Sequence, residues 1–192
     1  LARRRAILSQ RTDLTFPFTA LDVVLLGRSP YAGESSRRTD HDIATSAMRK
    51  CGVYGLADRT YTTLSGGEQQ RVQLARVLAQ LGVTQDGGVA DAEGRCLFLD
   101  EPTSSLDIAH QHAILGLART LADAGMTIVA VLHDLNLAAM FSDRVFLMKK
   151  AKVVEQGTPA EVIRPDAVQA VFDIAVRLVP RPDGGGGFVV PC

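Results

Sequence analysis

The sequence predicts an α/β fold, and three observations support this prediction. Residues 95–100 and 126–132 are short apolar runs with the length of buried strands. The segment between them, 104–124, carries apolar residues at helical spacing and ends at Gly125, a residue type favoured just after a helix. A strand, a helix and a second strand in this order are typical of a βαβ unit, in which the two strands lie parallel. We therefore expect layers of helix and parallel sheet.

Composition and charge exclude several other classes. The chain has 192 residues, of which 46% are hydrophobic and 22% charged, and this balance excludes a disordered polar tail. Its 21 Lys and Arg residues equal its 21 Asp and Glu residues, which argues against a nucleic-acid binder, because phosphate binding needs a basic excess. The longest apolar run is far shorter than the about 20 residues that span a bilayer. Three widely separated cysteines argue against a disulfide scaffold or a zinc site.

The first part of the chain predicts a mostly helical subdomain over about residues 11–81, placed before the α/β layer. Its first stretch, 11–31, is apolar and has the character of a loop, whereas helices are predicted at 37–51 and, with the strongest signal in the chain, at 65–81. Residues 82–94 are rich in Gly and Asp and are predicted to link the subdomain to the layer.

The α/β core is predicted over about residues 95–157 and is followed by a C-terminal part, 158–192. In the core, Asp134 is placed to cap a short helix, and 144–148 has the pattern of a third strand. In the C-terminal part we expect a short helix that begins at Thr158, a helix at 166–173, and a hairpin of 177–180 with 188–191.

The start of the helix at 65–81 has the pattern of an anion site. Ser65 and Glu68 have the spacing of a capping box, which satisfies free backbone donors at a helix start. Between them lie Gly66 and Gly67, although each glycine costs a helix about 1 kcal/mol relative to alanine. Glycines are useful there if backbone N–H groups must approach a phosphate closely at the positive end of the helix dipole.

The end of the strand at 95–100 has the pattern of a catalytic edge. Two acids, Asp100 and Glu101, emerge where ligands of α/β sheets bind, beyond the carboxyl ends of the strands. Asp100 suits Mg²⁺, and Glu101 could polarise an attacking water. His133 ends the next strand, which we expect to be the neighbour, and could contact a transferring phosphoryl group. The other histidines, His41, His110 and His112, are interpreted as surface residues.

Taken together, these segments resemble the nucleotide-binding subunits of ATP-binding-cassette (ABC) transporters. The match to family motifs comprises the signature LSGGEQQR (64–71), the Walker B strand CLFLDEP (96–102), the D-loop SSLD (104–107), the switch histidine His133 and the Q-loop glutamine Gln10. Order and spacing agree over essentially the whole chain. Its sequence is most similar to the subgroup that imports iron complexes and cobalamin, and within that subgroup to the hemin importers.

This resemblance implies a fold and a set of roles. The fold is that of the ABC-type P-loop ATPases, with a helical signature subdomain. The subunits form a head-to-tail homodimer in which each ATP is covered by the partner's signature motif, so Ser65, Gly66, Gly67, Glu68 and Asp107 would contact nucleotide across the interface. Asp100 and Gln10 would hold Mg²⁺, partly through water, Glu101 would orient the hydrolytic water, and His133 would contact the γ-phosphate.

The resemblance also implies partners and a location. An importer of this kind has two membrane permease subunits and a periplasmic or surface heme-binding protein, with the ATPase at the cytoplasmic face of the inner membrane. The apolar stretch 16–31 could receive a helix of the permease or could pack locally. A ferric-siderophore or cobalamin importer is the alternative within the subgroup. A chromosome-maintenance ATPase is a more distant one, although such proteins need heptad coiled coils and this chain has none.

One family element is missing from the sequence. The P-loop, G-x-x-x-x-G-K-[ST], cradles the phosphates of ATP. The chain has only four lysines, Lys50, Lys149, Lys150 and Lys152, and none is followed by Ser or Thr. With a first residue other than Met, we expect an N-terminally truncated cassette, and a naturally decayed subunit is the alternative. The chain as written is then expected to hydrolyse no ATP. Its central sheet is expected to be incomplete, and the protein to have low solubility.

Overall fold

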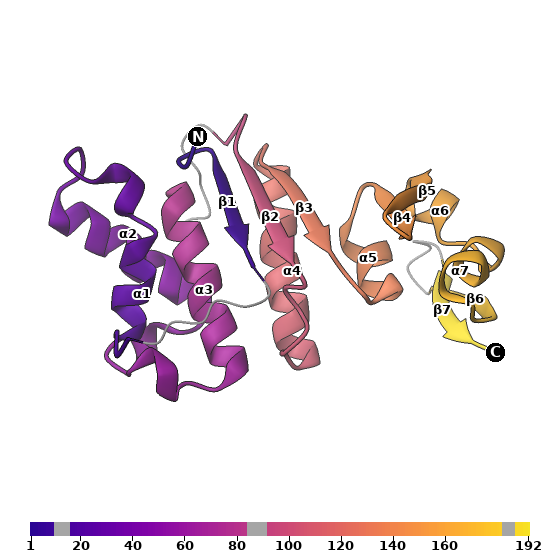
Figure 1. Ribbon diagram of the computed structural model, residues 1–192, viewed down its shortest axis with the longest axis horizontal. Coiled ribbons are helices and arrows are strands. Elements are labelled where there is room, and N and C mark those ends of the chain that lie inside the picture. Colours follow the sequence, from indigo (N-terminus) through magenta and orange to yellow (C-terminus); the bar gives the residue numbers. More distant parts are fainter. Residues whose placement is uncertain (10–15, 84–91, 182–186) are drawn as a thin grey trace. The chain divides into compact units, whose positions relative to one another are not determined.

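The computed structural model of the chain describes residues 1–9, 16–83, 92–181 and 187–192 (Figure 1). It divides into two compact units, Leu1–Val131 and Leu132–Cys192, and each is described by itself. The predicted divisions near residues 81, 95 and 157 stay predictions.

The first unit contains a three-stranded parallel sheet. Its strands are β1 (Arg5–Leu8), β2 (Cys96–Asp100) and β3 (Thr127–Val131), in the order β1-β2-β3. The predicted parallel pair β2–β3 is confirmed. Strand β1 was not predicted, and it pairs with β2 along its whole length of four residues. The strand that carries the acids at its end is therefore the middle strand of the sheet.

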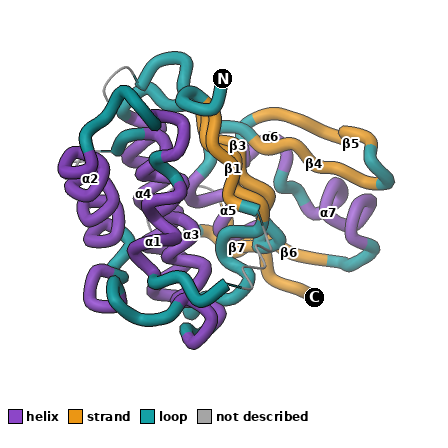
Figure 2. The backbone as a smooth tube through the Cα atoms, turned by 60° about the vertical axis from the view of Figure 1, so that its left-hand side comes forward, coloured by secondary structure: helices purple, strands orange, loops and turns teal. Residues whose placement is uncertain are grey.

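The two faces of this sheet differ in their surroundings. On one face, Ala6, Leu8, Leu97 and Leu99 are each 1% exposed and belong to the main core cluster. Figure 2 shows the helices α1 to α4 of this unit on one side of the sheet. On the opposite face, the side chains of Ile7, Val129 and Val131 are about half exposed, at 49%, 47% and 50%. Parallel sheets are normally covered on both faces, so this apolar surface is unusual.

Helices fill the chain between β1 and β2: α1 (Ala20–Leu26), α2 (Arg37–Lys50) and α3 (Gly66–Leu81), with short 3₁₀ turns at Ser29–Tyr31, Tyr54–Leu56 and Tyr61–Thr63. The predicted helices at 37–51 and 65–81 are confirmed. The loop-like character assigned to 11–31 was wrong for its second half, because Thr19 and Asp22 form a capping box that starts α1. Ala20, Val23 and Val24 of α1 are fully buried, so local packing uses one face of this stretch.

The segment Gly27–Tyr31, which follows α1, is joined to α2 and α3 by its side chains. Arg28 is 6% exposed, and its guanidinium donates to the carboxylate of Asp40 on α2 (2.8 Å) and to the carbonyl of Ala79 on α3 (2.8 Å). The ring of Tyr31 lies under this guanidinium, 3.7 Å from its carbon to the ring centroid, and the Tyr31 hydroxyl donates to Gln80 (3.0 Å). The buried charge is thus paired, which a buried arginine requires.

The helix between β2 and β3 is α4 (Ile108–Asp123), which begins at the N-cap Asp107. We predicted a start near residue 104. The structure places residues 104–107 before the helix, because the carbonyl of Glu101 accepts a turn bond from the Ser104 N–H (3.3 Å), and Leu106 N–H bonds to Thr103 (3.3 Å).

The second unit is built from short elements: α5 (Leu135–Phe141), β4 (Val145–Lys149), β5 (Lys152–Gly157), α6 (Pro159–Val162), α7 (Pro165–Phe172), β6 (Val176–Pro180) and β7 (Gly187–Pro191). Asp134 caps α5, and β6 and β7 form a hairpin, as predicted. The predicted third strand is β4, but it pairs antiparallel with β5, which we did not predict. Among the described residues of both units, no helix has the length and hydropathy needed to cross a membrane.

Candidate functional site

The first turn of α3 is stabilised by a capping box. The carboxylate of Glu68 accepts hydrogen bonds from the backbone N–H and the hydroxyl of Ser65, both at 2.8 Å, and the Ser65 hydroxyl oxygen accepts from the Glu68 N–H (3.4 Å). The bond from the Ser65 N–H, followed by that from its hydroxyl, keeps the pKa of Glu68 below its usual value. Glu68 is therefore charged at neutral pH and fixes Ser65 at the helix start.

The two glycines after Ser65 have different surroundings. A Cβ atom on Gly66 would meet no atom within 4 Å, so its backbone faces open space. A Cβ atom on Gly67 would lie 3.2 Å from the carbonyl oxygen of Ser105 and 3.3 Å from Leu106 Cδ2. Gly67 thus permits a close approach between the signature helix and the turn after β2, while Gly66 leaves the helix end accessible.

These segments border an open hollow of about 420 Å³. It is lined by the start of α3, by the turn after β2 and by the start of α4, through Ser65, Gly66, Gly67, Glu68, Arg71, Ser105, Leu106, Asp107 and His110. The 16-residue helix α3 directs the positive end of its dipole into this space, and Arg71 adds a cation at its wall. Such a hollow suits an anionic group, as the sequence predicted for this helix start.

Asp107 and His110 form a pair at the rim of the hollow. The Asp107 carboxylate accepts from the His110 backbone N–H (2.9 Å), and its oxygen lies 2.7 Å from His110 Nδ1. These two contacts, the backbone one first, hold the pKa of Asp107 below its usual value. The interpretation of His41, His110 and His112 as surface residues is confirmed, since His41 is exposed and the other two are partly exposed. The place of His110 at the hollow was not predicted. Only the position of His110 three residues after Asp107 could have indicated this.

The acids at the end of β2 differ in conformation. Asp100 is the last residue of the strand and its side chain is exposed. Glu101 follows with a left-handed backbone, φ +48°, which costs a residue other than glycine of order 1–3 kcal/mol. Its carbonyl accepts from the Ser104 N–H (3.3 Å), the Ser104 hydroxyl (3.2 Å) and Gln70 Nε2 (3.2 Å). The backbone at Glu101 is thus held by bonds on its carbonyl, at a strained position of the kind that clusters at functional sites.

Two predicted site residues, His133 and Gln10, are not among the described residues of the first unit. His133 lies two residues after the end of β3, the neighbour of β2 as predicted, but it belongs to the second unit, and its side chain is exposed there. Gln10 lies outside the described residues. The first unit thus brings together Ser65, Gly66, Gly67, Glu68 and Asp107 around one hollow, with Asp100 and Glu101 at the end of the adjacent strand.

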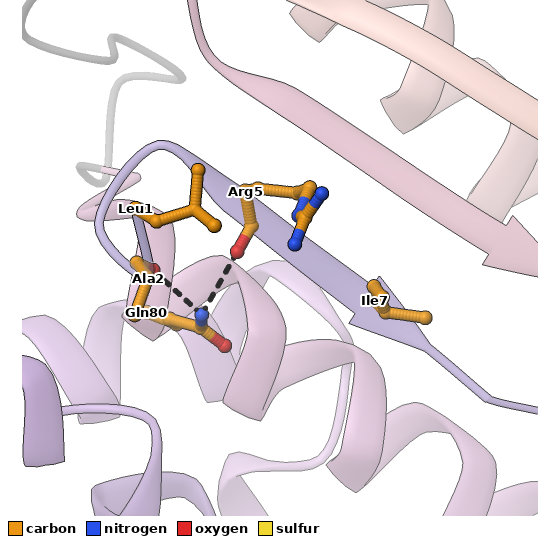
Figure 3. A pocket seen from close by; sticks show the side chains of 5 residues that line it. All are labelled: Leu1, Ala2, Arg5, Ile7 and Gln80. Atoms are coloured by element: carbon orange, nitrogen blue, oxygen red, sulfur yellow. Dashed lines mark hydrogen bonds between the residues drawn. The ribbon is translucent and has the colours of Figure 1, made fainter.

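A second hollow, of about 410 Å³, contains none of the predicted site residues. It lies beside β1 and is lined by Leu1, Ala2, Arg5, Ile7 and Gln80 (Figure 3). The amide of Gln80 donates to the carbonyls of Ala2 (2.7 Å) and Arg5 (3.1 Å), so it fixes the chain before the strand. We assign this amide a structural role.

The described residues contain no cluster of three or more His, Cys, Asp or Glu side chains that could hold a metal. Magnesium does not require one, because it is commonly held by one or two carboxylates together with waters and substrate phosphates. The exposed carboxylate of Asp100 fits this requirement as a single ligand or through water.

Curated relatives match nearly the whole chain. It is 46% identical over 190 residues to the hemin import ATP-binding protein HmuV of Myxococcus xanthus, an alignment that covers 99% of this chain and 69% of the relative. It is 44% identical to the protein of the same name from Methylobacillus flagellatus, covering 96% of this chain and 67% of the relative. The chain thus spans about two thirds of their length. No protein-family model matches it.

Solved structures agree in fold. A transporter described as of the metal-chelate ABC type, in an inward-facing conformation, matches with a TM-score of 0.79 at 25% identity, over 98% of this chain and 73% of that one. The ATP-binding cassette MJ0796, in a dimer bound to ADP and Pi, matches with a TM-score of 0.67 at 27% identity, over 81% of this chain and 63% of that one. These similarities agree with the hollow at the start of α3 and with the two acids at the end of β2. They show that the chain belongs to the ATPase subunits of ABC transporters, in the family of the hemin import ATP-binding proteins.

Proposed function

We propose that this chain is part of the ATP-hydrolysing subunit of a hemin importer. The observation that carries the proposal is the hollow of the first unit, where the signature turn and the D-loop meet beside the strand that ends in Asp100 and Glu101. The relatives' names supply the solute, because nothing in the hollow is shaped to read a porphyrin.

In this proposal the nucleotide lies between two subunits. Mg²⁺–ATP, when bound, supplies the γ-phosphoryl group that is transferred to water. Ser65, Gly66 and Gly67 cover the nucleotide held by the other subunit, and the open space at Gly66 supports this because a phosphate could approach its backbone. Glu68 fixes Ser65 in place, and Asp107 borders the same space.

The remaining roles belong to the subunit that holds the nucleotide. The carboxylate of Asp100 would hold magnesium, partly through water and together with Gln10, and Glu101 would orient the attacking water. His133 contacts the γ-phosphate, and Gln10 also connects the site to the permease. For the last two residues the support is their match to family motifs.

The same proposal names partners and a location. The subunit forms a homodimer at the cytoplasmic face of the inner membrane and binds two permease subunits, which receive hemin from a periplasmic or surface heme-binding protein. In the stretch 16–31, Phe16 and Leu26 remain 66% and 43% exposed, and they are the residues we propose for contact with a permease helix.

The solute is tested with a completed cassette, a chimera in which a family segment carrying G-x-x-x-x-G-K-[ST] precedes Leu1. Reconstituted with a hemin permease and its heme-binding protein, it should show ATP turnover stimulated by hemin. Ferrichrome and cobalamin, each with its own binding protein, serve as matched comparisons. Stimulation by either of these, without stimulation by hemin, would transfer the proposal to the siderophore or cobalamin alternative.

The 192-residue chain itself should show no Mg²⁺-dependent ATP turnover. Its sequence contains no G-x-x-x-x-G-K-[ST] motif, whose backbone N–H groups and lysine hold the β- and γ-phosphates in this family. Phosphate release by the purified chain measures this, with the completed cassette as the positive control. Turnover by the purified chain would contradict the expectation.

A further inference from the structure

The signature helix touches the residue that carries the catalytic acid. Gln70 lies on α3, one turn beyond Gly66, and its Nε2 donates to the carbonyl oxygen of Glu101 at 3.2 Å. This contact joins residues 31 positions apart in the sequence, from different elements of the first unit. Because a carbonyl oxygen can only accept, the amide of Gln70 must present its NH₂ group to it. The other end of the amide, Oε1, is buried without a hydrogen-bond partner among the described residues.

The carbonyl that Gln70 reaches belongs to a strained residue. Glu101 has φ +48°, a backbone conformation that L-residues with side chains rarely adopt, and such conformations persist only where neighbouring contacts hold them. Among the described contacts of its carbonyl, two donors belong to Ser104, in the same turn. The donor from Gln70 comes from outside the turn, on α3.

A second contact lies beside the first. Gly67, one turn before Gln70 on the same helix, packs against the carbonyl of Ser105. A Cβ atom added to Gly67 would lie 3.2 Å from that carbonyl oxygen. The signature helix therefore touches the turn 101–105 at both of its ends, by a hydrogen bond at Glu101 and by close packing at Ser105.

From these contacts we infer that Gln70 is a positioning residue, which ties the lid-forming helix to the backbone of the acid within one chain. The inference rests on the proposed function, in which Ser65 to Gly67 serve one nucleotide and Glu101 serves the other. A displacement of α3 at the first nucleotide then moves, through Gln70, the backbone of Glu101 at the second nucleotide. Gln70 itself touches no nucleotide in this scheme.

Gln69 provides a matched control. It is the neighbouring residue on the same helix, is partly buried, and its Nε2 also donates to backbone carbonyls, those of Tyr61 (3.1 Å) and Leu64 (3.2 Å). Neither carbonyl belongs to the turn after β2. Gln69→Ala thus removes the same kind of bond from the same helix without touching Glu101.

The first test uses hydrogen exchange of the 192-residue chain, read by mass spectrometry or NMR. In Gln70→Ala, exchange of amides in 101–106, including the Ser104 N–H that bonds to Glu101, should accelerate about tenfold, the equivalent of one hydrogen bond. Gln69→Ala should accelerate exchange around residues 61–64 and leave 101–106 unchanged. Exchange in 101–106 that stays within twofold of the parent in Gln70→Ala, or that rises equally in Gln69→Ala, overturns the inference.

The second test measures kinetics in the completed cassette. Gln70→Ala should lower kcat about tenfold and leave the KM for ATP within twofold, because the acid is displaced while the nucleotide contacts remain. Gln70→Glu keeps the side-chain volume but loses the hydrogen-bond donor, and it should lower kcat as Gln70→Ala does. This variant shows that the loss does not come from a cavity left by the smaller alanine. An equal fall in kcat in Gln69→Ala would overturn the inference. Failure of the proposed function is distinguished from this by Glu101→Gln, whose unchanged turnover would refute the role of the acid while leaving the exchange result intact.

Discussion

Replacing Glu101 by Gln in the completed cassette should lower kcat for ATP hydrolysis by about a hundredfold to ten-thousandfold. The amide keeps the shape of the side chain but cannot accept a proton from the attacking water. The KM for ATP should change little, because the contacts assigned to the nucleotide are left in place. Steady-state phosphate release measures both quantities.

Two comparisons make this prediction specific. Glu93→Gln changes an exposed acid just before β2 and should leave kcat within twofold. The free energy of unfolding of Glu101→Gln should lie within about 0.5 kcal/mol of the parent, since both side chains are equally poor in the left-handed conformation. Parent-level turnover in Glu101→Gln would show that another group activates the water.

Gly27→Ala should destabilise the first unit by about 3 kcal/mol or more. Gly27 has an ordinary right-handed backbone (φ −60°), so conformation does not demand a glycine there. A Cβ atom would instead lie 2.2 Å from the carbonyl oxygen of Arg76, where α1 meets α3. A backbone oxygen cannot move away unless the helix shifts, and α3 carries the signature turn.

The control for this prediction is Gly116→Ala, in the middle of α4, where a Cβ atom would meet nothing within 4 Å. It should stabilise the unit by about 0.5–1 kcal/mol. Urea unfolding followed by tyrosine fluorescence reports on this unit alone, because all three tyrosines, Tyr31, Tyr54 and Tyr61, belong to it. A midpoint for Gly27→Ala equal to that of the parent would show that the helices pack less closely than described.

The sequence predicted those elements whose signals are local. The capping box of Ser65 and Glu68 marked the start of α3, and the apolar runs marked β2 and β3, which are confirmed. Two elements were missed for physical reasons. α1 has only seven residues and its start depends on the Thr19–Asp22 box, while β1 is four residues long and is stabilised by pairing with a strand about ninety positions away.

The candidate site divides in the same way. Ser65, Gly66, Asp100 and Glu101 could be selected from residue type and spacing alone. The contact of Gln70 with Glu101 and the place of His110 at the hollow depend on how α3, the turn after β2 and α4 pack, which no local pattern contains. The left-handed backbone at Glu101 is likewise set by its surroundings and not by its residue type.

The central position of β2 has a consequence for the precision of this enzyme class. An outer strand has one hydrogen-bonded neighbour and frays most readily, whereas β2 has paired neighbours on both sides from Cys96 to Leu99 and pairs with β3 at Asp100. An acid attached to the end of that strand starts from the least mobile backbone that a three-stranded sheet offers. Thermal motion of the water-orienting group should then be governed by the turn that follows the strand, and sequence drift in β1 or β3 can be absorbed without displacing it.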